Sequence, residues 1–237
     1  MAPPFELYSA IMPAGSSTAS GADMAKFMLA MLGHGQLGST RILKPESVKL
    51  LMSDSFANVP GLPGMAHGFM VRGVSTTRLV GHGGNTGDFH SDLVLAPDAD
   101  FGFFISETGG QGSYGGRTEL TEAIIGRLFP QAPTPSYSGS DAEIAQPGSY
   151  RANRRDYSRA PNPARDIKVS RPAAGTVMID NDGVKTQWRR VGPATYEQVT
   201  GVREGGPYDR ITFYRSGDGM RLSYATQPHM TWHLVKP

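Results

Sequence analysis

The sequence predicts an α+β protein in which an antiparallel sheet with flanking helices is followed by a small all-β barrel or sandwich. Apolar residues recur with helical spacing near the N-terminus. From about residue 68 they alternate with polar residues instead, which is typical of strands. A Pro/Ser-rich stretch then precedes a series of short β runs. The 30 glycines and 18 prolines, beside only 38% hydrophobic residues, agree with a β-rich, loop-rich chain.

Two helices are predicted in the first part of the chain. Ser20 is a suitable N-cap, and Asp23 follows it three residues later. The apolar stripe that follows has the spacing of one helix face and comprises Met24, Phe27, Met28, Met31 and Leu32. Gly33 is expected to end this helix, and Pro45 to open a second one.

The alternating region predicts four strands and a third helix. The strands are expected at residues 69–74, 78–82, 88–95 and 101–106. Thr118 is expected to cap the helix, and Pro130 to stop it.

The stretch 130–147 predicts a linker between an α+β domain over residues 1–129 and a small β domain over residues 148–237. In the second domain the β runs lie at 167–170, 176–180, 184–188, 196–200, 210–214 and 221–225. Asn181-Asp182-Gly183 predicts a hairpin turn between two of them.

Charge and composition restrict the partners. The net charge is only +2 and the basic residues are scattered, so we expect neither a nucleic-acid partner nor an anionic membrane partner. The absence of cysteine excludes disulfides and thiolate metal sites. The chain carries no signal-like start and no apolar run of transmembrane length, so it is expected to be soluble, with no compartment predicted.

The run Gly81 to Asp92 (GHGGNTGDFHSD) is the most specific motif. It resembles the third catalytic signature of the serine β-lactamase, penicillin-binding-protein and esterase superfamily, in which a Lys-Thr-Gly or His-Gly-Gly triplet lies beside a serine nucleophile. The resemblance implies a truncated β-lactamase-like domain followed by that superfamily's small β-barrel domain. No Ser-x-x-Lys and no Tyr-x-Asn motif occurs, so the nucleophile that the family uses is missing.

Two acids depart from the family pattern and suggest a metal site. Asp88 and Asp92 stand beside His90, and in a strand these three side chains would share one face, with about 7 Å between successive members. His82 would end the neighbouring strand. Imidazole and carboxylate ligands favour a divalent metal, with zinc first and manganese or iron as alternatives. A metal-bound water could then attack an ester without a serine.

Simpler interpretations stand beside this one. His82 and His90 can be inherited residues of the fold, Asp92 can face solvent, and Asp88 can occupy a turn, where aspartate is favoured. Ser91 is the best remaining serine nucleophile, although no motif marks it as activated. His34 and His67 lie in Gly-rich segments, and either could complete a site in three dimensions.

The function predicted from these residues is a metal-dependent hydrolase of activated esters, either phosphotriesters and other phosphoesters or aryl esters, acting on a small-molecule substrate. His82 and Asp88 would be catalytic, and His82, Asp88, His90 and Asp92 would bind the metal. Two alternatives remain, a non-catalytic ligand- or partner-binding fragment and a residual serine esterase or β-lactamase-like enzyme. A sheet with an uncovered edge also predicts a homodimer or higher homo-oligomer.

Overall fold

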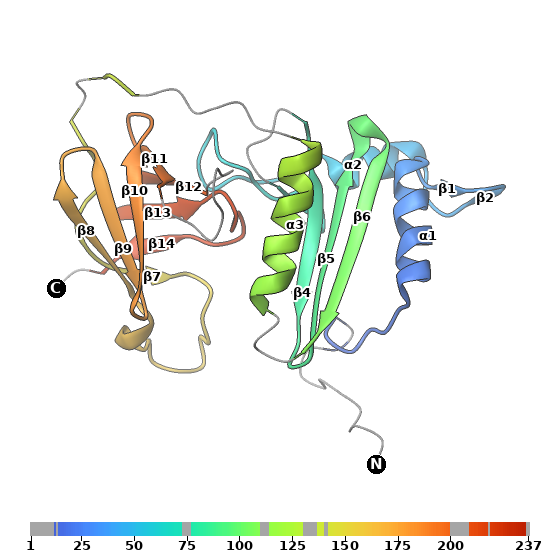
Figure 1. The fold of residues 1–237 in the computed structure, drawn as a ribbon, viewed down its shortest axis with the longest axis horizontal. Helices are drawn as coiled ribbons and strands as arrows, with labels where there is room; N and C mark the ends of the chain where they lie inside the picture. Colours follow the sequence, from blue (N-terminus) through green and yellow to red (C-terminus); the bar gives the residue numbers. More distant parts are fainter. Residues whose placement is uncertain are drawn as a thin grey trace, which may run out of the picture. The chain divides into compact units, whose positions relative to one another are not determined.

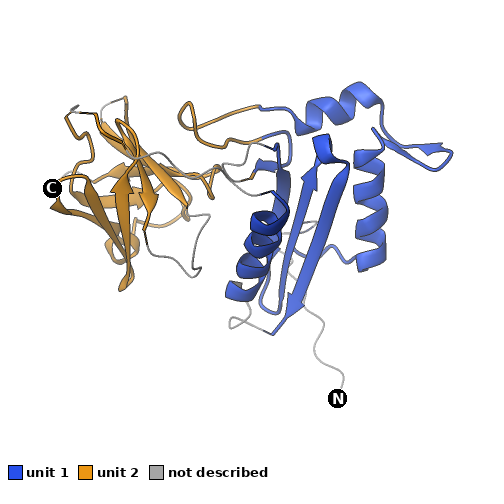
Figure 2. Cartoon of the chain, turned by 45° about the horizontal axis from the view of Figure 1, so that its top comes forward, with its two compact units in different colours: residues 1–54, 66–71, 75–130 blue, residues 55–65, 72–74, 131–237 orange. Residues whose placement is uncertain are grey.

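The computed structural model describes residues 12, 14–72, 77–109, 114–129, 137–139, 142–199, 209–217 and 219–235. It divides the chain into two compact units (Figure 2). Unit 1 comprises residues 1–54, 66–71 and 75–130, and unit 2 comprises residues 55–65, 72–74 and 131–237. The chain therefore enters unit 2 briefly between α2 and β3, which the simple N-to-C division of the sequence does not include.

The N-terminal helices of unit 1 begin and end where the sequence signals lie. Helix α1 (Gly21–Leu32) has Ser20 as its N-cap, and the Ser20 hydroxyl accepts a hydrogen bond from the Asp23 backbone N–H at 3.2 Å. Helix α2 (Pro45–Met52) has its proline in the first turn. A two-stranded ribbon, β1 (Gln36–Leu37) and β2 (Thr40–Arg41), connects the two helices.

The sheet of unit 1 is antiparallel, with the strand order β3-β4-β5-β6 (Figure 1). Its strands are β3 (Met70–Val71), β4 (Val80–Asn85), β5 (Phe89–Ala96) and β6 (Phe101–Thr108). A short 3-10 turn, η2 (Pro97–Ala99), joins β5 to β6. Helix α3 (Tyr114–Leu128) begins four residues before the predicted Thr118. The predicted sheet is thus present, but β3 is shorter and β4 longer than expected.

The two faces of this sheet carry different helices. Leu93 and Leu95 pack with residues of α1 and α2, among them Met31 and Val48. Leu79, Val94 and Ala96 pack with Ile125 of α3 on the other face. This alternation follows from the two-residue period of a strand, and it decides on which side each functional side chain lies.

Unit 2 contains a closed eight-stranded antiparallel barrel, which is the first of the two predicted β architectures. The strand order around it is β10-β11-β12-β13-β14-β7-β8-β9. The strands are β7 (Gly148–Ala152), β8 (Ile167–Ala173), β9 (Thr176–Asn181), β10 (Val184–Arg190), β11 (Thr195–Gln198), β12 (Arg210–Ser216), β13 (Gly219–Tyr224) and β14 (Trp232–Leu234). A 3-10 turn, η4 (Pro163–Arg165), precedes β8.

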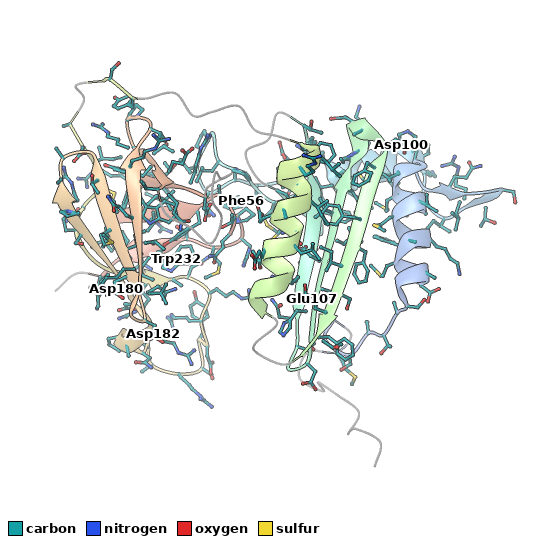
Figure 3. All side chains as sticks on the ribbon, in the orientation of Figure 1. Phe56, Asp100, Glu107, Asp180, Asp182 and Trp232 are labelled. Carbon is teal, nitrogen blue, oxygen red and sulfur yellow. The ribbon has the colours of Figure 1, made fainter. Side chains whose placement is uncertain are left out.

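The six predicted β runs correspond to β8 to β13, whereas β7 and β14 were not predicted. These two short strands pair with each other, and β7 also pairs with β8 while β14 pairs with β13, so together they close the barrel. The turn after β9 is as predicted, since Asp182 and Gly183 both have positive φ, of 53° and 84°. The Asp180 side chain, labelled with Asp182 in Figure 3, accepts from the Gly183 N–H at 2.9 Å.

Aromatic side chains fill the barrel. Trp188, Tyr150, Tyr196 and Phe213 are at most 2% exposed, and the Phe213 ring stands edge-on to both tyrosines. Eight strands enclose an interior just wide enough to be filled by side chains of this size. The strands of the barrel therefore enclose its hydrophobic core.

Candidate functional site

The strand register separates the four residues predicted to form one site. His82 on β4 stands directly opposite Leu93 on β5, so the two side chains share a face. Because Asp92 and Leu93 are consecutive in one strand, they point to opposite faces. His82 therefore lies on the α1/α2 face, while His90 and Asp92 lie on the α3 face. The predicted grouping of His82 with the other three is corrected, because sequence alone did not fix the register between β4 and β5.

His90 and Asp92 belong to a buried polar layer beneath α3. Each is 2% exposed. The Nδ1 atom of His90 lies 2.9 Å from the Asn85 side-chain oxygen, and the Thr121 hydroxyl of α3 donates to Asp92 Oδ2 at 3.2 Å. Buried polar groups are stable only when hydrogen-bonded, and these contacts meet that requirement.

Arg117 and Glu107 extend the polar layer. Arg117 of α3 donates to the Ser91 carbonyl oxygen at 3.0 Å. A Cβ atom added to Gly83 would lie 2.3 Å from Arg117 Nη1 and 3.4 Å from Asp92 Oδ1, so the guanidinium and the carboxylate both lie over this glycine. Glu107 stands opposite His90 in the sheet, and its carboxylate lies against Gly116 near the start of α3 (Figure 3). The layer holds the sheet to α3.

Asp88 lies apart from this layer. It precedes the first residue of β5, is exposed, and its carbonyl oxygen accepts from the Gly109 N–H at 3.3 Å. It therefore occupies the turn between β4 and β5. Within the described residues no group of three or more His, Asp or Glu side chains could hold a metal ion. The described residues therefore do not fit the predicted zinc, manganese or iron centre.

The α1/α2 face of the sheet carries a pocket of about 380 Å³. Its lining is mostly apolar and comprises Met24, Phe27, Met31, Leu43, Leu51, Phe69 and Leu93, with His67, Gly68 and His82. Among the described residues the two histidines are the only titratable ones that line it, and both are exposed. An open apolar pocket with a few convergent polar groups is the usual form of a small-molecule site.

Local backbone contacts position the two histidines. His82 is held by β4, whose pairing with β5 aims the side chain to the α1/α2 face. The backbone N–H of His67 donates to the Leu51 carbonyl oxygen at the end of α2 at 3.1 Å, and Gly68 follows with a φ of 87°. Sequence reasoning marked His67 only as a lone histidine in a Gly-rich segment. Its place in the pocket depends on the tertiary contact with α2.

The glycines next to His82 differ in how closely other atoms approach them. A Cβ on Gly81 would lie against the Leu93 carbonyl oxygen, and this backbone contact is too short for any larger residue. A Cβ on Gly83 would meet the end of the flexible Arg117 side chain, which can move aside, and a Cβ on Gly84 would meet no atom within 4 Å. Gly81 is thus required by the pairing of β4 with β5, whatever chemistry takes place at His82.

Comparison with known proteins finds no matching family model and no matching curated protein. Three solved structures are similar in part. A crystal structure of SurE with D-Leu has a TM-score of 0.44 and 16% identity, and the match covers 81% of this chain and 44% of the SurE chain. A second SurE structure has a TM-score of 0.47 and 15% identity, with coverages of 88% and 47%. An octameric penicillin-binding protein homologue from Pyrococcus abyssi has a TM-score of 0.37 and 16% identity, with coverages of 90% and 46%.

These findings correct the predicted family. No family model matches the chain, so membership of the serine β-lactamase superfamily has no support. The observed architecture is an α+β unit and a closed barrel, without a specifically β-lactamase-like fold. The chain spans less than half the length of each of these three structures. No helix in the described part of the chain is long and apolar enough to cross a membrane.

Proposed function

We propose that the chain hydrolyses activated esters on the α1/α2 face of unit 1, with the apolar part of the substrate bound in the pocket. The observation that carries this proposal is the pair of imidazoles, His67 and His82, in a pocket that is otherwise lined by apolar side chains. A volume of about 380 Å³ falls within the range of small-molecule sites.

The chemistry requires only an imidazole and water. His82 in its neutral form accepts a proton from a water molecule as the water oxygen attacks the ester carbon, and a new C–O bond forms. The bond to the leaving oxygen then breaks, and the imidazolium returns the proton to that oxygen. His67 lines the same pocket, and in this proposal it donates a hydrogen bond to the leaving oxygen. Aryl esters suit this arrangement because a good leaving group lowers the demand on the protein.

The substrate preference follows from the lining. Phe27 and Leu93 offer apolar contact surface, so an ester of a medium-length apolar acid should bind better than an acetate. Each methylene group that enters the pocket contributes about 0.8 kcal/mol, so substrate affinity should rise with chain length until the pocket is full.

The test is the hydrolysis of 4-nitrophenyl butyrate and octanoate by the full chain. The variant His82→Asn should lose about 100-fold or more in kcat/KM, the loss typical for removal of a general base. The matched control is His34→Asn, since His34 is an exposed histidine outside the pocket, and asparagine tolerates its φ of 53°. Equal rates in the two variants would contradict the role of His82. Inhibition by a chelator would contradict hydrolysis by imidazole and water alone.

A second candidate function is the binding of a second copy, which the β6 edge favours. The sheet order places β6 at one end, and within the described residues no strand pairs with its outer edge. An eight-residue edge with free backbone groups can pair with the same edge of another copy. Sedimentation equilibrium should then give a mass near twice 25.4 kDa. A mass equal to one chain at micromolar concentration would exclude this homodimer.

A further inference from the structure

The outer wall of the barrel places three basic side chains in one row. Arg221 on β13 stands directly opposite His233 on β14, and His233 stands directly opposite Arg151 on β7. Directly opposite residues of antiparallel strands share a face, with their Cβ atoms about 4.5–5.5 Å apart. The row is therefore a product of the register of β7 and β14, the two strands that close the barrel.

Within the described residues, a counter-ion lies at only one end of this row. Asp166 accepts two hydrogen bonds from Arg151, at 2.9 Å from Nε and 2.8 Å from Nη2, and its side chain is 3% exposed. Both carboxylate oxygens are thus used by one guanidinium. In the described part of the chain, the side chains of Arg221 and His233 make no hydrogen bond and no ion pair.

The arrangement disfavours a charged His233 in the free protein. Partial burial lowers the pKa of His233 below its ordinary value of 6.5, and the charges of Arg151, Arg221 and Arg155 lower it further. The Asp166 carboxylate raises the pKa of His233, but its effect is smaller than that of burial, of Arg151 or of Arg221. Like charges directly across a sheet are destabilising, so protonation of His233 between Arg151 and Arg221 has a cost in the free protein.

We infer that Arg221 and His233 form a binding site for a phosphate or phosphate monoester on the outer wall of the barrel. A guanidinium donates two parallel hydrogen bonds to two phosphate oxygens, and a protonated imidazole donates a third. The bound ligand should be a dianion. Its two negative charges would balance Arg221 and the protonated His233, because Arg151 is already paired with Asp166. Phosphate monoesters have their second pKa near 6 and carry this charge at neutral pH.

The test follows the His233 ring by NMR as pH is varied, with the full chain in chloride and then in saturating inorganic phosphate. Phosphate should raise the pKa of His233 by about one unit, because a bound anion favours the charged imidazole. The variant Arg221→Gln should abolish this shift and weaken phosphate binding about tenfold. The control Lys185→Gln removes one exposed positive charge from β10 and should leave both readouts unchanged.

The outcomes separate a site from general electrostatics. Equal loss in Arg221→Gln and Lys185→Gln would show that phosphate responds only to net charge, and would overturn the inference. No change in the His233 pKa with phosphate would also overturn it. An unchanged near-ultraviolet circular dichroism spectrum shows that Arg221→Gln is folded. The variant Arg221→Lys should bind phosphate better than Arg221→Gln, because a positive charge remains at this position. This experiment is independent of ester hydrolysis on unit 1.

Discussion

The two units solve the problem of burying a β-sheet in different ways. Unit 2 closes eight strands on themselves, so every strand has two neighbours and the interior is filled by aromatic side chains. Unit 1 has a four-stranded open sheet, which needs α3 on one face and α1 with α2 on the other. The open sheet is the one that retains a polar layer and a pocket.

The difference shows where each unit can place functional groups. A barrel of this size uses its interior for packing, so its available chemistry is on the outer wall, as at Arg221 and His233. In unit 1 the helices cover the sheet incompletely, and side chains such as His82 reach an open pocket between them. The following substitutions test this contrast, from the largest expected effect to the smallest.

Removal of a large aromatic side chain from the barrel should have the largest effect on stability. Trp188 is 2% exposed, and Trp188→Ala should lower the free energy of unfolding by about 3–5 kcal/mol through lost burial and the cavity left behind. Urea denaturation followed by circular dichroism measures this. Val184→Ala, on the same strand but 68% exposed, should change stability by less than about 0.5 kcal/mol.

The polar layer of unit 1 should affect stability but not catalysis. Asp92→Ala removes the acceptor of the Thr121 hydroxyl, and the cost of leaving a buried donor unsatisfied is about 1–3 kcal/mol. Ester hydrolysis per folded molecule should stay at the wild-type rate, because His82 lies on the other face. The exposed Asp98→Ala is the control for stability. Complete loss of hydrolysis in folded Asp92→Ala would instead show that Asp92 is required for the reaction at His82, and would contradict the separation of the two faces.

The pocket should tolerate truncation of its rim with little loss of stability. Phe27 is 40% exposed and lines the pocket, so Phe27→Ala should raise KM for an octanoate ester roughly tenfold, the equivalent of about 1.4 kcal/mol of lost apolar contact. Leu29→Ala changes a residue of the same helix that is 58% exposed and does not line the pocket. A KM that is equally raised in both variants would point to a general effect on α1.

The smallest effect should be a pH dependence at the start of α1. Hydrogen bonds from Ser20, and then Lys26, hold the pKa of Asp23 below 3.8 in the folded chain. The folded pKa is therefore below the unfolded one, so this stabilisation is fully present above pH 3.8 and is lost as the pH falls through the lowered value. Stability should decline less steeply below pH 4 in Asp23→Asn than in the wild type. Parallel pH profiles would show that the cap contributes nothing measurable.

Local signals predicted the elements of both units. The capping pair at Ser20 and Asp23 and the proline at Pro45 place the first two helices, because these signals act within a few residues. The alternation in β5 and β6 and the turn at Asp182 depend on equally local preferences. The strands β7 and β14 escaped prediction because three to five residues carry too little pattern, and their pairing joins segments about 80 residues apart.

The candidate site could be predicted only as a set of residue types. The sequence by itself determined that the chain combines an α+β part with a β-rich part and has no cysteine. It also showed that His82, Asp88, His90 and Asp92 lie within eleven residues of one another. The tertiary structure decided that His82 faces a pocket with His67, while His90 and Asp92 are buried beneath α3. The physical reason is the register of β4 against β5, since a shift of one residue exchanges the two faces of a sheet and no local signal in a Gly-rich strand fixes it.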